Sequence, residues 1–133
     1  MHLKVITHEN VIFDEDVNEI YSRSLEGEFG ILKGHEPIMA SLDIGVTKVV
    51  QDSGVKLFTT MGGILQFRDD NAIILTDAGE FGEDIDVARA KEAKARAEAR
   101  LAEVNAQIDA KRAEVALARA MVRLKAALKN KNS

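Results

Sequence analysis

Six arginines in the last fifty residues are the side chains best suited to chemistry. They fall into two groups with helical spacing: Arg89, Arg96 and Arg100, then Arg112, Arg119 and Arg123. Arginines four residues apart destabilise an isolated helix by about 0.2–0.5 kcal/mol per pair. Arg119 and Arg123 have no carboxylate three or four residues away that would offset this cost. The pattern indicates an external anion, either a phosphate or an acidic protein surface, and the alternative is a solvated basic face.

No other residues form a pattern typical of catalysis. The glycine-rich segment 27–34 lacks the Gly-Lys-Ser/Thr of a phosphate-binding loop. The histidines lack metal-ligand spacing, the serines lack a nucleophile-elbow context, and there is no cysteine to bind a metal or form a disulfide: His2, His8, His35, Ser22, Ser24, Ser41 and Ser53. The sequence therefore predicts a non-catalytic protein with no metal site and no required cofactor.

The chain changes character at Asp84. Residues 1–83 contain β-branched runs punctuated by glycines, with six Lys/Arg against fifteen Asp/Glu. Residues 84–133 are rich in alanine and arginine, contain neither glycine nor proline, and have twelve Lys/Arg against seven Asp/Glu. We therefore expect an acidic domain of strands over 1–83 and a basic helical domain over 84–133, with different roles.

Short runs with strand character follow one another closely in the first domain. Turn residues between 46–51 and 55–60, and again between 62–67 and 72–76, predict two hairpins. Segment 10–16 is interpreted as an acidic turn region and 26–37 as a glycine-punctuated loop. Gly62-Gly63 indicates a bulge or a close backbone approach. Many short strands at close spacing favour an antiparallel sandwich or barrel.

After Asp84 the spacing of apolar residues becomes helical. One alanine stripe is predicted on the first helix: Ala88, Ala95, Ala99, Ala102 and Ala106. Another is predicted on the second: Ala113, Leu117, Ala120, Leu124 and Leu128. Segment 105–109 is the expected turn of an antiparallel pair. An alanine seam buries little area, which suits a pair that opens, although a permanently folded pair is equally compatible. If these stripes face each other, the arginine groups point to opposite sides.

Three segments resemble motifs of a known family. They are Gly27-Glu28-Phe29-Gly30-Ile31-Leu32-Lys33-Gly34-His35-Glu36-Pro37, Gly62-Gly63-Ile64-Leu65 and Ile85-Asp86-Val87-Ala88-Arg89-Ala90. In this order, over essentially the whole chain, they are similar to motifs of the bacterial epsilon subunit of F-type ATP synthases. Lys33, Met61 and Gln66 depart from the commoner residues of that family, all within the first domain.

The resemblance implies an α+β fold, with an antiparallel sandwich of about ten strands followed by an antiparallel two-helix hairpin. It implies a non-catalytic rotor subunit in the central stalk of a proton-translocating ATP synthase. The sandwich would bind the gamma subunit and the c-ring. The hairpin would extend along gamma and inhibit ATP hydrolysis by meeting the catalytic beta subunits and the alpha subunits. The basic residues for that contact would be Arg112, Arg119, Arg123 and Lys125.

In some bacterial members the folded hairpin binds ATP as a regulatory ligand. The matching positions here are Glu80, Ile85, Asp86, Arg89, Arg96, Arg119 and Arg123. Two other classes of function stay open from the residues alone. An adaptor binding nucleic acid would use the basic hairpin, but the second domain has no aromatic residue for stacking. A small hydrolase would need a catalytic constellation, which the sequence lacks.

The resemblance also implies a location at the cytoplasmic face of the bacterial cell membrane. The longest apolar runs are far shorter than the roughly 20 residues of a spanning helix. The chain is therefore expected to be a soluble, peripheral protein that meets the membrane only through its complex.

Overall fold

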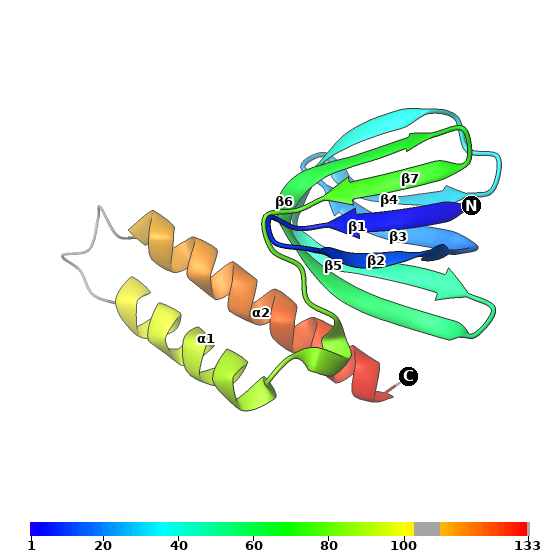
Figure 1. The fold of residues 1–133 in the computed structure, drawn as a ribbon. Coiled ribbons are helices and arrows are strands. Elements are labelled where there is room, and N and C mark those ends of the chain that lie inside the picture. Colours follow the sequence, from blue (N-terminus) through cyan, green and yellow to red (C-terminus); the bar gives the residue numbers. More distant parts are fainter. Residues whose placement is uncertain (103–109, 133) are drawn as a thin grey trace.

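The computed structural model describes residues 1–102 and 110–132, the side chains of 130–132 excepted. Seven strands form one sheet that curls into a β-sandwich, and two antiparallel helices lie beside it (Figure 1). The elements are β1 His2–Ile6, β2 Val11–Asp16, β3 Glu19–Ser24, β4 Gly27–Leu32, β5 Ile38–Gln51, β6 Gly54–Arg68, β7 Asn71–Leu75, the 3-10 turn η1 Gly82–Asp84, α1 Val87–Leu101 and α2 Ala110–Asn132. The predicted α+β fold is confirmed.

The strands follow the order β2-β1-β7-β6-β5-β3-β4 across the sheet. Neighbours are antiparallel except β1 and β7, which are parallel, so the prediction of an all-antiparallel sandwich was wrong for this pair. The seven strands are fewer than the ten expected because β5 and β6 are long, with 14 and 15 residues. The sheet closes over a core whose largest fully buried side chains include Leu3, Ile20, Phe58, Leu65 and Ile74.

Both predicted hairpins are confirmed. Residues Asp52 and Ser53 connect β5 to β6, where Gln51 pairs with Gly54. Asp69 and Asp70 connect β6 to β7, with φ angles of 52° and 63°. Two consecutive left-handed residues twist the chain in the sense that a right-twisted hairpin requires, and aspartate adopts this conformation more readily than most residues.

Two segments interpreted as a turn and a loop are strands instead. Segment 10–16 contains β2, the edge strand beside β1, and its carboxylates point outward where charge discourages pairing with another chain. Segment 26–37 contains β4, which pairs with β3. Gly30 of β4 lies beneath the ring of Tyr21, and a Cβ there would come within 2.9 Å of that ring. The glycine therefore accommodates a neighbouring strand instead of forming a turn.

The glycine pair in β6 makes the close backbone approach that was predicted. Gly62 and Gly63 have φ angles of 82° and 114°. A Cβ on Gly63 would lie 1.9 Å from the carbonyl oxygen of Leu75 in β7. The pairing of β5 and β6 has the same register on both sides of this point, so there is no inserted residue and no bulge.

The helices pack through a different face of α1 from the one predicted. Its buried residues are Ala90 and Ala97, whereas Ala88, Ala95, Ala99 and Ala102 are exposed. The chosen face begins at Val87 and ends at Leu101, the bulkiest apolar residues of α1, because larger side chains gain more from burial. The α2 stripe was correct at Ala113 and Ala120, which are buried, but Leu128 is exposed. The expected turn at 105–109 and Ala106 lie outside the described residues.

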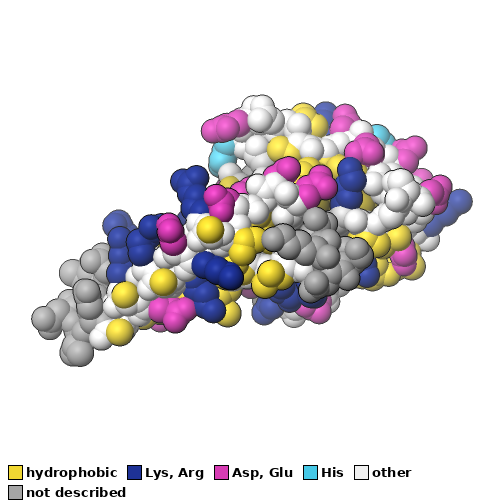
Figure 2. All heavy atoms as spheres, turned by 90° about the horizontal axis from the view of Figure 1, so that it is seen from below, with side chains coloured by type: hydrophobic (Ala, Val, Ile, Leu, Met, Phe, Trp, Pro, Cys, Tyr) yellow, Lys and Arg dark blue, Asp and Glu magenta, His cyan; other side chains and the backbone are white. Residues whose placement is uncertain are grey.

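Among the described residues, α2 packs on β5 and β6, and α1 packs mainly on α2 (Figure 1). Near the C-terminal end of α2, Ala126 and Ala127 pack with Ile85, with Ala90 of α1 and with Val46 of β5. Lys and Arg side chains gather along the helices, and many Asp and Glu side chains lie over the sandwich (Figure 2). Within the described part of the chain, neither helix is long and apolar enough to cross a membrane.

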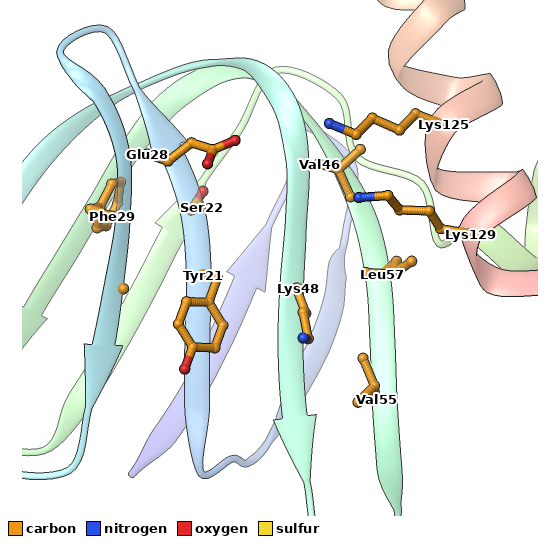
Figure 3. Close-up of a pocket in the computed structure, with 11 residues that line it drawn as sticks. Tyr21, Ser22, Glu28, Phe29, Val46, Lys48, Val55, Leu57, Lys125 and Lys129 are labelled. Carbon is orange, nitrogen blue, oxygen red and sulfur yellow. The ribbon is translucent and has the colours of Figure 1, made fainter. Parts of the chain in front are cut away.

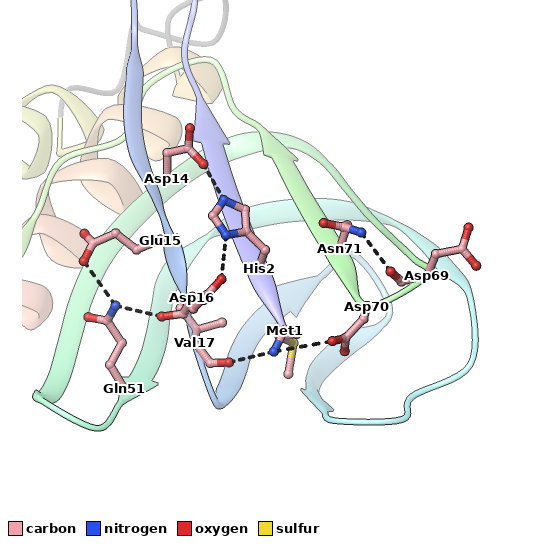
Figure 4. A network of polar contacts seen from close by, with 10 residues as sticks. All are labelled: Met1, His2, Asp14, Glu15, Asp16, Val17, Gln51, Asp69, Asp70 and Asn71. Carbon is pink, nitrogen blue, oxygen red and sulfur yellow. Dashed lines mark hydrogen bonds and ion pairs between the residues drawn. The ribbon is translucent and has the colours of Figure 1, made fainter.

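His2 joins the first strand to two carboxylates of the edge strand (Figure 4). Its Nδ1 lies 2.8 Å from the Oδ1 of Asp16, and its Nε2 is hydrogen-bonded to Asp14. The hydrogen bond to Asp14, followed by that to Asp16, raises the pKa of His2 above its usual 6.5. The charged imidazolium therefore stabilises the pairing of β1 with β2.

We expect the stabilisation by His2 to depend on pH. A pKa raised in the folded state gives stability that is complete below pH 6.5 and is lost as pH rises through the folded-state value. Urea unfolding of the wild type and of His2→Gln at pH 5.5 and pH 9 measures this. The wild type should be the more stable at pH 5.5, with a smaller difference at pH 9. An equal difference at both values would contradict the role of the imidazolium.

Candidate functional site

A cleft of about 450 Å³ opens where the start of α1, the C-terminal half of α2 and the strap formed by residues 78–86 meet. Its lining combines cationic, acidic and small apolar residues: Glu80, Asp84, Ile85, Asp86, Arg89, Ala90, Ala93, Arg96 and Arg123. The three guanidinium groups come from both helices, so the cleft exists only while the helices are folded together on the sandwich.

The strap holds Glu80 firmly against the sandwich. The backbone N–H of Thr59 in β6 donates to the carbonyl of Glu80 at 2.9 Å, and the N–H of Glu80 donates to the Thr59 hydroxyl at 3.1 Å. The next residue, Phe81, places its ring 5.7 Å from that of Phe58 and 6.1 Å from that of Phe13. These contacts fix the backbone of Glu80, so its carboxylate projects from a fixed point at the edge of the cleft.

Asp86 begins α1 and orients its first turn. Its carboxylate accepts a hydrogen bond from the backbone N–H of Arg89 at 3.1 Å, as an N-cap residue does. The buried side chain of Ile85 packs against Ala90 and against Ala126 and Ala127 of α2. The same turn therefore positions both residues. Asp86 is held by its capping hydrogen bond, and Arg89 is held by the first turn of α1.

The arginines of the cleft differ in their partners. Arg123 donates from Nε to Oε1 of Glu80 at 2.8 Å, with the two side chains 31% and 41% exposed. Among the described residues, this is the only hydrogen bond or ion pair from a helical side chain to the rest of the chain. Arg89 and Arg96, seven residues apart on one face of α1, form no ion pair with a described residue. Guanidinium groups in this state suit the bidentate binding of a phosphate.

The structure brings together most of the residues that the sequence pointed to for ATP. Six of the seven line the cleft: Glu80, Ile85, Asp86, Arg89, Arg96 and Arg123. Arg119 is exposed on α2, one turn before Arg123, and does not line the cleft. Asp84 lines the cleft and was not predicted, although its position two residues before Asp86 was a signal for it.

The second predicted group, on the basic second helix, is spread over several surfaces. Arg112 and Arg119 are exposed, Arg123 is in the cleft, and Lys125 is exposed beside the sandwich. Arg123 has no carboxylate three or four residues away on its helix, but in the folded chain it pairs with Glu80, 43 residues away in the sequence.

The arginines of both helices reach one cleft because α1 packs through Ala90 and Ala97. The predicted stripe through Ala88 and Ala95 would have pointed the two groups to opposite sides. When Ala90 is buried between the helices, the neighbouring Arg89 lies at the edge of their interface. It then lines the same cleft as Arg123. In residues 1–102 and 110–132, no group of three His, Asp or Glu residues could hold a metal ion.

Comparisons with known proteins cover the whole architecture. Residues 1–82 match the beta-sandwich domain of the ATP synthase delta/epsilon chain, and residues 83–127 match its long alpha-helix domain. The ATP synthase epsilon chain of Symbiobacterium thermophilum is 45% identical over 128 residues, covering 96% of this chain and 92% of that protein. The epsilon chain of Pelotomaculum thermopropionicum is 43% identical over 125 residues, covering 94% and 93%.

Solved structures agree with this. A chain of the mitochondrial ATP synthase of Euglena gracilis, in a structure with OSCP, F1 and the c-ring, has a TM-score of 0.82 and 27% identity. The similarity covers 95% of this chain and 79% of that one. A chain from the central stalk and c-ring of Tetrahymena thermophila ATP synthase, at 16% identity and a TM-score of 0.68, shares the fold. The sandwich, the two helices and these matches show that the chain belongs to the family of ATP synthase delta/epsilon chains, of the bacterial epsilon type.

Proposed function

We propose that this chain couples rotation to ATP synthesis in the central stalk and that its folded helices form a regulatory ATP site. Family membership already makes it a stalk subunit of ATP synthase, which is not itself catalytic. The observation that carries the regulatory part is the cleft, where Arg89 and Arg96 of α1 meet Arg123 of α2 and Glu80 of the strap. The family assignment leaves the nucleic-acid adaptor without support.

The sandwich, residues 1–83, is proposed to bind the gamma subunit and the c-ring. An apolar patch on its outer face supports this. Ile64 pairs with Leu75, and Leu75 also pairs with Ile6, so these side chains are neighbours across β6, β7 and β1. Ile64, Ile73 and Leu75 are 44%, 40% and 50% exposed. Contiguous exposed apolar side chains of this kind are typical of a protein interface.

The helices, residues 84–133, are proposed to alternate between this folded form and an extended form that inhibits ATP hydrolysis. The folded form is held by an alanine seam and one partly exposed ion pair, Arg123–Glu80, both of which contribute modestly to stability. A phosphate ligand would contact residues from both helices and the strap, so it would bind the folded form and stabilise it.

In the extended form, the basic surface of α2 would meet acidic surfaces of the catalytic beta subunits and the alpha subunits. Arg112 and Arg119, which are exposed already in the folded form, would be available for this contact. In the cell, the complex would place the chain at the cytoplasmic face of the bacterial membrane as a peripheral protein.

Removal of the helices tests the division of roles. A chain ending at Glu83, assembled into its ATP synthase, should bind gamma as the full chain does, while ATP hydrolysis rises severalfold because the inhibitory segment is absent. Hydrolysis by the purified complex and co-purification with gamma measure the two effects. A second variant keeps the full chain and carries Arg112→Gln and Arg119→Gln. It should relieve inhibition in part. Unchanged hydrolysis after truncation would refute the regulatory role, and loss of gamma would refute the assignment of docking to the sandwich.

A further inference from the structure

A second hollow, separate from the arginine cleft, lies between the outer face of the sheet and the last turns of α2 (Figure 3). It is an open groove of about 830 Å³. Its sheet side crosses the neighbouring strands β4, β3, β5 and β6, which at normal strand spacing span about 14 Å. A groove of this volume is within the range of small-molecule sites.

The floor of the groove on β5 and β6 is aliphatic. Val46 and Leu57 lie close to α2, and Val55 extends the floor away from the helix (Figure 3). Val55 is 43% exposed, whereas Leu57 is 8% exposed. An apolar chain lying over Val55 and Leu57 would remove their remaining surface from water.

On the far side of the groove, the ring of Tyr21 is held by neighbouring residues. The ring of Tyr21 lies against Gly30, and the ammonium group of Lys48 is 5.6 Å from the centre of that ring. The Tyr21 hydroxyl donates to Glu19 at 2.6 Å, which fixes the ring in place and raises the pKa of Tyr21. Because Gly30 and Lys48 lie against the ring of Tyr21, a nucleobase cannot stack freely on that ring.

Three ammonium groups approach the groove from two directions. Lys125 and Lys129, one turn apart on α2, extend toward the sheet, and Lys48 extends from β5 (Figure 3). Against them the groove holds one carboxylate, that of Glu28. None of the three lysines forms an ion pair with a residue that the structure describes. Three cations gathered around one groove are complementary to an anionic head group.

We propose that this groove binds a single-chain amphiphile of the fatty-acid class. Its carboxylate would lie among Lys48, Lys125 and Lys129, and its aliphatic chain would lie over Leu57 and Val55. The bound molecule would join α2 to the sheet and so hold the helices in their folded place. This inference goes beyond the proposed function and does not depend on ATP binding in the arginine cleft.

The test uses the full chain and octanoate as the probe, titrated by calorimetry and by amide chemical shifts. The triple variant Lys48→Gln, Lys125→Gln, Lys129→Gln should bind octanoate at least tenfold more weakly. The matched control Lys33→Gln, Lys91→Gln, Lys111→Gln removes the same charge outside the groove and should bind as the wild type does. All six substituted lysines are exposed, so the melting temperature of each variant is sufficient to check its folding.

A second variant tests the floor without changing the lysines. Val55→Asp places a carboxylate where the chain should lie and is expected to weaken octanoate binding at least tenfold. The uncharged probe 1-octanol should bind much more weakly than octanoate. Equal affinity of the triple variant and its control, equal binding of octanol and octanoate, or shift changes confined to residues outside the groove would each overturn the proposal.

Discussion

Replacing Gly63 by alanine is expected to destabilise the sandwich by more than about 3 kcal/mol, a large part of the roughly 5–15 kcal/mol by which proteins are stable. The added Cβ would lie 1.9 Å from the carbonyl oxygen of Leu75 and 2.8 Å from the Cα of Thr76. Both are backbone atoms, of the last residue of β7 and the residue after it, so no side chain can turn aside to make room. Urea unfolding followed by circular dichroism measures the loss.

A second glycine of the same strand separates the clash from the backbone conformation. Gly54 also has a positive φ, 138°, but no atom lies within 4 Å of the Cβ that alanine would add. Gly54→Ala should therefore cost only the strain of the backbone, about 1–3 kcal/mol. If Gly63→Ala is no more destabilising than Gly54→Ala, the close approach of β6 to β7 does not constrain the fold.

Neutralising Arg89 and Arg96 together is expected to abolish stabilisation by ATP. At a concentration of 100 times its dissociation constant, a ligand that binds only the folded state adds about 2.7 kcal/mol. For a protein of this size that raises the melting temperature by roughly 10 °C. Hydrogen bonds to charged groups contribute about 1.5–3 kcal/mol each, so Arg89→Gln with Arg96→Gln should lower the affinity at least about 100-fold. Differential scanning fluorimetry at increasing ATP concentrations measures both effects.

The control for this pair is Arg100→Gln with Arg112→Gln. Both arginines are exposed and lie outside the cleft, so the net charge changes equally while the lining of the cleft does not. Arg123 is a poorer choice for the test, because its substitution also removes the hydrogen bond to Glu80. A shift in melting temperature that survives in the Arg89/Arg96 variant would place the nucleotide elsewhere, and an equal loss in the control would show an effect of net charge alone.

Local patterns were sufficient for the hairpins, because turn chemistry at Asp69 and Asp70 acts over a few residues. Local patterns were insufficient for β4, where Gly30 leaves room for the ring of Tyr21 on the neighbouring strand β3. The acidic residues of β2 suggested a turn, although at an edge strand they point outward and one pair binds His2. In each failure the decisive partner was distant in sequence.

The face of α1 and the cleft show the same limit. Alanines of equal size give no contrast between faces, so the choice was made by Val87 and Leu101 at the helix ends. The residues of the cleft came from the family resemblance and not from spacing. The pairing of Glu80 with Arg123 joins residues 43 apart, and only the packing of α2 on the strap brings them together.

The parallel pairing of β1 with β7 has a consequence for biosynthesis. β1 leaves the ribosome before the other six strands, and because it lies between β2 and β7, one side of it stays unpaired until Asn71–Leu75 has emerged. The β5–β6 hairpin can form earlier, since its contacts are local along the chain. Closure around the N-terminal strand is therefore the late step of folding, and a nascent chain arrested before β7 would present an open strand edge to chaperones and to other chains.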